Sequence, residues 1–283
     1  MKLFKKEQGS FGEVKEVSAL SDFCCLGKCY GFMRSVLNKK NREGGFTLAE
    51  VLITLGIIGV VAALTLPSVI ANYQKKQTVV KLKKVYTTLS QAVDMSKADY
   101  GDVSTWGLEE GYGTESGAVA QDFVSKFADK FVVPYLAKAQ NLGYISLENF
   151  GYKKLPSNLD GTQPLWLQST SRSNMFILSD GTPIGIKYDT MNIGTEDEPK
   201  SVVWAIFFWT DLNGINGPNV VGRDIFLFKL ELSENARLLP YYHENSSFAS
   251  NLRNCKIGGL ESRVCTGVIV ADGWQMKSYY PWR

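Results

Sequence analysis

One long apolar segment constrains the fold of this 283-residue chain more than any other feature. Residues 51–66, which read VLITLGIIGVVAALTL, carry no charge, and the wider window 46–69 holds a single charge, that of Glu50. About 20 apolar residues in a helix are enough to cross the hydrocarbon core of a bilayer. The segment therefore predicts a transmembrane helix to about residue 69 or an uncleaved signal anchor. A buried helix of a soluble domain is the alternative interpretation.

The residues before this segment do not follow the pattern of an ordinary secretory signal, which places its cleavage site after a shorter apolar stretch. Here a basic stretch, two glycines, a phenylalanine and then an acid precede the apolar run, in the order KKNREGGFTLAE over residues 39–50. Gly45 has no side chain, so its backbone can enter a tight protease cleft. The carboxylate of Glu50 is costly in lipid unless it has a partner.

The sequence GGFTLAEVLITLGIIGVVAALTLP resembles the class III signal of type IV pilins and type II secretion pseudopilins. The resemblance implies cleavage after Gly45 by a prepilin peptidase and N-methylation of Phe46. It also implies that Glu50 acts in assembly, with the new amino group of a neighbouring subunit as its partner. Pro67 falls where these proteins often carry a helix-kinking proline. An unpartnered acid at the membrane interface is the alternative interpretation of Glu50.

The same resemblance implies partners and a location. The expected partners are the prepilin peptidase, other pilin or pseudopilin subunits, the inner-membrane assembly platform and membrane lipid. The expected location is a bacterial inner membrane, crossed once, with the leader inside and the head outside the cytoplasm. Basic residues flank the apolar run on both sides, and their count alone slightly favours the opposite orientation. The motif is more specific than this near-even count, so we expect the orientation that the resemblance implies.

Three parts of the chain are predicted: a leader at residues 1–45, a long helix at 46–98 and a globular head at 99–283. The leader is longer than is usual for the family, and Met33 offers a simpler start. Residues 1–45 hold 9 basic and 5 acidic residues, whereas the remainder holds 22 and 23. This nearly neutral remainder gives no support for direct nucleic-acid binding.

Helical spacing of apolar residues continues beyond the apolar run, at Leu82, Val85, Leu89 and Val93. This spacing predicts that the second half of the long helix packs its apolar stripe under the head. A phenylalanine at every fourth position predicts a short helix around residues 120–131. The rest of residues 99–173 is expected to form loops.

Four β-branched or aromatic segments predict strands, at residues 175–178, 182–188, 202–210 and 225–232. An Asp-Gly pair between the first two indicates a hairpin. Short connections favour an antiparallel meander packed on the long helix. The predicted fold class is therefore α+β, with a small antiparallel sheet head on a long N-terminal helix, which is also the pilin-like architecture that the resemblance implies.

The connection between the last two predicted strands alternates oxygen-bearing side chains with glycine. Its candidate cation ligands are Asp211, Asn213, Asn219 and Asp224. Calcium prefers oxygen ligands of this kind, and several pseudopilins carry calcium in a comparable loop. The pattern is not an EF-hand, because Gly222 stands where the bidentate glutamate belongs. A tight Asx-rich turn uses the same residues, so a calcium site and a structural turn both stay open. No other cofactor is required.

Two cysteines, Cys255 and Cys265, follow the predicted cleavage point. An even pair in an exported domain suggests a disulfide, with two free buried thiols as the alternative. The aromatic residues of the C-terminal tail are expected to pack onto the sheet.

No catalytic residue is assigned. The chain has no GxSxG, HExxH or GxxxxGK[ST] motif, and its single histidine, His243, has no triad context. The sequence therefore favours a structural subunit of a type IV pilus or type II secretion pseudopilus over an enzyme. A signal-anchored enzyme or ligand-binding protein, and a competence pseudopilin for DNA uptake, are the alternatives.

Overall fold

The computed structural model describes residues 45–108, 117–192, 201–257 and 259–282. The chain divides into two units with the boundary between Val60 and Val61. All of the predicted leader except Gly45 lies outside the described residues, and so does the alternative start at Met33.

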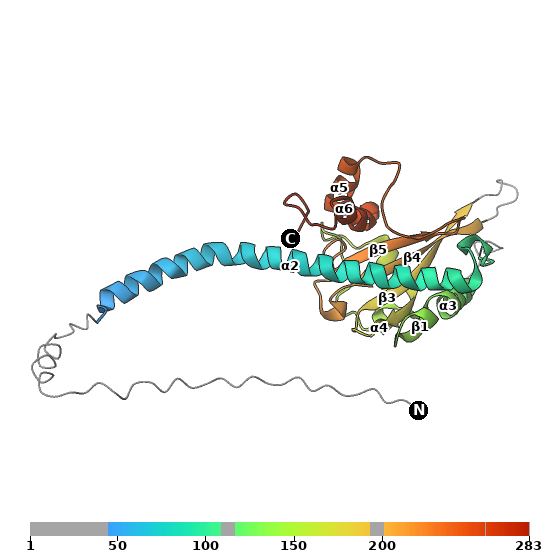
Figure 1. Ribbon diagram of the computed structural model, residues 1–283, viewed down its shortest axis with the longest axis horizontal. Coiled ribbons are helices and arrows are strands. Elements are labelled where there is room, and N and C mark those ends of the chain that lie inside the picture. The colour runs from blue at the N-terminus through green and yellow to red at the C-terminus, as the bar shows by residue number, and fades with distance from the viewer. Residues whose placement is uncertain (1–44, 109–116, 193–200, 258, 283) are drawn as a thin grey trace, which may run out of the picture. The chain divides into compact units, whose positions relative to one another are not determined.

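Helix α2, Leu48–Tyr100, contains 53 residues and agrees with the predicted long helix (Figure 1). All residues from 45 to 70 are exposed, including the whole apolar run. Pro67 lies inside the helix. Proline has no backbone N–H to donate and its ring crowds the preceding turn, so a kink at this position stays a prediction.

The later part of α2 packs against the sheet through one face. Its buried apolar side chains are Val79, Leu82, Val85, Leu89, Ala92 and Val93. Residues three and four apart lie on the same side of a helix, so this spacing forms one continuous stripe. The ring of Tyr86 lies 5.7 Å from that of Phe228 on the sheet. The prediction that this stripe packs under the head is confirmed.

Six strands form one antiparallel sheet in which spatial order follows chain order. The strands are β1 (Gln140–Ser146), β2 (Arg172–Ile177), β3 (Pro183–Asn192), β4 (Ser201–Asp211), β5 (Ile225–Glu231) and β6 (Leu238–Pro240). The predicted meander and the α+β class are confirmed, and β2 to β5 cover the four predicted strands.

The sequence-based prediction missed two strands: it expected loops at the position of β1 and assigned no element at that of β6. Strand β1 carries exposed polar residues and a register shift between Asn141 and Gly143, so no apolar run marks it. Strand β6 has three residues, too few for a periodic pattern. Each of these two strands is defined by its pairing with a neighbouring strand, β1 with β2 and β6 with β5.

The remaining elements are short. The helices are α3 (Gly117–Phe131), α4 (Leu147–Phe150), α5 (Phe248–Ile257) and α6 (Cys265–Ala271). The 3-10 turns are η1 (Val103–Thr105), η2 (Val133–Tyr135), η3 (Leu165–Leu167), η4 (Gly214–Asn216) and η5 (Gly259–Val264). The predicted helix around residues 120–131 is thus present in α3.

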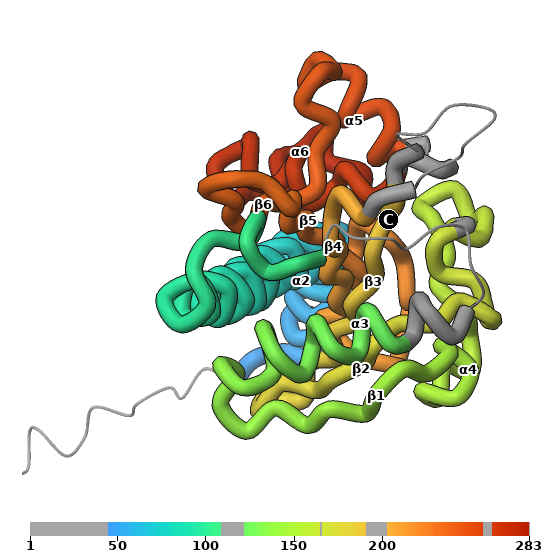
Figure 2. The backbone as a smooth tube through the Cα atoms, turned by 90° about the vertical axis from the view of Figure 1, so that its right-hand side faces the viewer, coloured from blue at the N-terminus to red at the C-terminus, as the bar shows by residue number. Residues whose placement is uncertain are grey.

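Different segments cover the two faces of the sheet. Helix α3 lies on the same face as α2, with the rings of Phe127 and Phe208 6.2 Å apart. Successive residues of a strand point to opposite faces, so Phe207 and Trp209 face the other side. Helix α6 lies next to β5 (Figure 2). The hydroxyl of Thr266 in α6 accepts the backbone N–H of Leu227 in β5 at 3.0 Å.

Candidate functional site

The start of α2 is closed by a reciprocal pair of hydrogen bonds between Thr47 and Glu50. Oε2 of Glu50 accepts the backbone N–H and the hydroxyl of Thr47, both at 2.9 Å. In return, the Thr47 Oγ1 accepts the backbone N–H of Glu50 at 3.2 Å. This arrangement is a capping box, which satisfies N–H groups that have no partner inside the helix. The predicted assembly residue therefore also caps the helix.

Sequence reasoning missed this cap, although the T-x-x-E spacing before an apolar run is its signature. The two predicted processing residues, Gly45 and Phe46, precede the helix and are exposed, with Phe46 87% accessible. The peptide bond between them thus belongs to non-helical chain. Proteases bind extended chain, so this placement suits cleavage, which stays a prediction.

Helix α2 is long and apolar enough to cross a membrane, and it is the one such helix among the described residues. Its apolar window has no buried residue. An exposed apolar surface of this length needs lipid or protein to cover it.

The second candidate site is the loop that joins β4 to β5, where the structure brings together the two predicted aspartates. Asp211 ends β4 and is fully buried, and Asp224 is 5% exposed. Tyr152 donates its hydroxyl to Oδ2 of Asp211 at 2.9 Å, and the backbone N–H of Asn213 reaches Oδ1 at 3.2 Å. The backbone N–H of Asn219 reaches Oδ2 of Asp224 at 2.9 Å.

Burial raises the pKa of both carboxyl groups. Removal from water raises the pKa of Asp211, and the nearby charge of Asp224 raises it further. Burial also raises the pKa of Asp224, against the hydrogen bonds from the backbone of Val220 and Asn219. It is therefore unfavourable for Asp211 and Asp224 to be ionised at the same time.

The two predicted asparagines bond mainly to the backbone of the loop. Asn213 donates its side-chain amide to the carbonyl of Gly217 at 2.6 Å. Asn219 accepts the N–H of Gly217 at 2.9 Å and donates to the carbonyl of Lys154 at 2.9 Å. These contacts tie the loop together through its backbone, and the one contact of the Asx-turn type is that of Asp211, whose Oδ1 accepts the backbone N–H of Asn213.

Within the described residues, no group of three or more His, Cys, Asp and Glu side chains is placed to hold a metal ion. A calcium ion at this loop would therefore rest on the two carboxylates together with amide and backbone oxygens, a ligand set that calcium accepts. Calcium binding at Asp211, Asn213, Asn219 and Asp224 stays a prediction.

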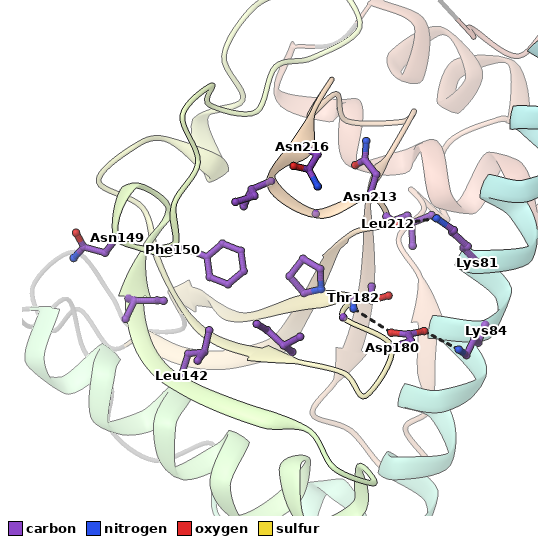
Figure 3. Close-up of a pocket in the computed structure, with 16 residues that line it drawn as sticks. Lys81, Lys84, Leu142, Asn149, Phe150, Asp180, Thr182, Leu212, Asn213 and Asn216 are labelled. Carbon is purple, nitrogen blue, oxygen red and sulfur yellow. Dashed lines mark hydrogen bonds and ion pairs between the residues drawn. The ribbon is translucent and has the colours of Figure 1, made fainter.

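A groove of about 900 Å³ lies beside this loop (Figure 3). Its floor is largely apolar, with Leu142 and Phe150 among the residues that line it. At its rim, Nζ of Lys84 lies 2.7 Å from Oδ2 of Asp180. Helix α2 and the β2–β3 turn are therefore joined by an ion pair at this edge of the groove.

The C-terminal region is fastened in two ways. Cys255 in α5 and Cys265 at the start of α6 form a disulfide with a Cα–Cα distance of 5.0 Å, which confirms the predicted pair. Tyr280 is buried and donates its hydroxyl to the carbonyl of Gly222 at 2.6 Å. Trp274 lies 5.4 Å from Tyr86, ring to ring. The tail aromatics thus pack on the β4–β5 loop and on α2, where packing on the sheet was predicted.

Comparison with known families agrees with the N-terminal geometry. Residues 40–66 match the prokaryotic N-terminal methylation motif, which supports a pilin-like prepilin signal at this end of the chain. With one long apolar helix, this signal indicates that the protein is anchored in a membrane.

Residues 68–283 match the family of unknown function DUF6613, and the chain belongs to that family. The comparisons with curated proteins and with solved structures gave no match.

Proposed function

We propose that the protein is a structural subunit, a pilin or pseudopilin, of a type IV pilus or type II secretion filament. One observation carries the proposal: the methylation motif at residues 40–66 includes the start of a 53-residue helix whose apolar first part is exposed. In this proposal membrane lipid covers the apolar surface first, and neighbouring subunits cover it after assembly into the filament. In this proposal, residues 1–45 are the leader, 46–98 the assembly helix and 99–283 the head.

Processing supplies the charge that assembly uses. A prepilin peptidase cuts between Gly45 and Phe46, and methylation of the new amino group leaves it positively charged. The carboxylate of Glu50 lies about one helical turn further along. In apolar surroundings an unpaired carboxylate is costly, so the pairing of Glu50 with the Phe46 amine of a neighbouring subunit favours entry into the filament.

The proposed location follows from the same signal. The leader faces the cytoplasm and the head lies on the other side of a bacterial inner membrane, where the Cys255–Cys265 disulfide can form and persist. The assembly platform in that membrane and other pilin or pseudopilin subunits are the proposed partners.

Mass spectrometry of the N-terminal peptide, taken from the protein in its native membrane, tests the processing step. The expected peptide begins with N-methylated Phe46. A peptide that runs through Gly45 in cells with an active prepilin peptidase contradicts the proposal and favours a signal-anchored enzyme or binding protein.

A pair of variants tests the assembly step. Glu50→Ala removes both the carboxylate and the helix cap, whereas Thr47→Ala removes the hydroxyl part of the cap and keeps the carboxylate. Both variants are expected to be cleaved. The processed Glu50→Ala protein should be lost from the sheared filament fraction, while Thr47→Ala should be retained there. Equal loss of the two would assign the effect to capping, and unchanged assembly of Glu50→Ala would remove the proposed role.

A further inference from the structure

A cavity of about 170 Å³ lies on the sheet face that α2 and α3 do not cover. Cross-strand pairing of Lys187 with Phe207, and of Trp209 with Leu227, places these four side chains on that face. Trp166, in η3, and Arg263, in η5, complete the cavity from two 3-10 turns. It is separate from the N-terminal site and from the β4–β5 loop.

Three residues that line this cavity carry nitrogen donors: Trp166, Lys187 and Arg263. Nε1 of Trp166 and Nε of Arg263 are buried and have no hydrogen-bond partner among the described residues. Nζ of Lys187 donates to the backbone carbonyl of Trp166 at 2.6 Å, which uses one of its three N–H groups. Buried donors without acceptors are rare in folded proteins, because each one loses its bonds to water.

The charge around the cavity is positive. Lys187 and Arg263 contribute two cations, and Asp189 is the single acidic residue in its lining. The guanidinium of Arg263 stacks on the ring of Tyr241, 4.9 Å from its centroid, and forms no ion pair within the described part of the chain. Burial alone lowers the pKa of Lys187 to about 8, as expected for an ammonium without an anionic partner.

The walls between the donors are aromatic or aliphatic. Trp166, Phe207, Trp209 and Leu227 supply them. A flat apolar body suits such walls, and a planar carboxylate accepts hydrogen bonds on two oxygens from donors of this kind. A small inorganic anion would leave the walls without a partner.

We propose that this cavity binds a small organic carboxylate, with the carboxylate on Lys187, Arg263 and Trp166 and the apolar body between the aromatic walls. The volume admits a molecule of about the size of a single ring with one carboxyl group. This site is independent of filament assembly, so a filament subunit would present it on the head.

Titration calorimetry on the full-length protein in detergent tests the site, with benzoate as the probe and benzamide as its neutral counterpart. Benzoate is expected to bind one to one and at least tenfold more tightly than benzamide. Inorganic phosphate is the third ligand. Binding of phosphate without benzoate would overturn the organic carboxylate, and equal binding of benzoate and benzamide would overturn the role of charge.

Variants connect the binding to named groups. Lys187→Met should weaken benzoate at least tenfold, and Lys187→Arg should restore part of the loss. Trp166→Phe keeps the wall and removes one donor, so a smaller loss is expected. Lys84→Met, which removes a cation from the separate groove, is the matched control and should bind like the unchanged protein. No benzoate binding by the folded unchanged protein, or full binding by folded Lys187→Met, would overturn the proposal.

Discussion

Replacing Lys187 with methionine should make the ligand-free protein more stable. Methionine has a similar length and no charge, so it can fill the space of the lysine stem next to Phe207. The partly buried ammonium of Lys187 has one hydrogen bond, to the carbonyl of Trp166 at 2.6 Å, and no ion-pair partner within the described residues. The substitution removes an unpaired charge from a partly buried position, together with that bond.

The magnitude follows from the pKa of Lys187, which burial lowers from 10.5 to about 8. This difference corresponds to at most about 3 kcal/mol of destabilisation of the charged form in the native state. Loss of the hydrogen bond to Trp166 opposes the gain by about 1 kcal/mol. The net gain at pH 7 is about 2 kcal/mol, which raises the Tm of a domain of this size by about 4–8 °C.

The pH dependence separates this mechanism from better packing. Between about pH 8 and 10.5 the unfolded chain still holds the Lys187 proton that the native state has released. Native stability therefore rises with pH across this window in the unchanged protein, and this contribution is absent in Lys187→Met. Thermal unfolding of both proteins in detergent, followed by tryptophan fluorescence, should show a gap in Tm between Lys187→Met and the unchanged protein that is smaller at pH 10 than at pH 7. A variant that is less stable at pH 7, or a gap that is equal at both pH values, refutes the reasoning.

Three further predictions concern the head. Gly185→Ala should cost about 1–3 kcal/mol in denaturant unfolding, because its Cβ would lie 2.2 Å from Nε1 of Trp209; an unchanged midpoint would contradict this packing. Replacing both Cys255 and Cys265 with serine should cost about 2–4 kcal/mol, and a reductant should then have no further effect. Above about pH 4 the native state holds a proton at Asp211 that the unfolded chain releases, so the Tm of the unchanged protein should fall as pH rises. In the presence of EDTA, Asp211→Asn should make this fall less steep. A slope equal to that of the unchanged protein would argue against the raised pKa.

The elements that could be predicted are those whose residues carry their own signal. The apolar run fixed the position of α2, and the β-branched segments that became β2 to β5 stood out from their surroundings. The Asp-Gly pair at Asp180 located the first hairpin. Periodicity and turn chemistry are local properties, so they survive in the sequence without knowledge of the fold.

The missed features depend on contacts between distant segments. Strand β1 exists because β2 offers it a partner, and α5 and α6 meet through a disulfide rather than through a repeating apolar pattern. The carboxylate cavity joins Trp166, Lys187 and Arg263, which are far apart in the chain. In the sequence these three residues look like ordinary members of a loop, a strand and a tail. Only the fold brings their donors to one place.

The agreement between strand order and chain order has a consequence for how the head can form. Each strand from β2 to β6 pairs with the strand that precedes it, so no strand must wait for a later part of the chain. In the proposed orientation, a chain that crosses the membrane from its N-terminal end can therefore add one strand at a time to the strand just before it. Helices α5 and α6 follow last in the chain, and the Cys255–Cys265 bond then joins these two helices beside a sheet whose strands are already present.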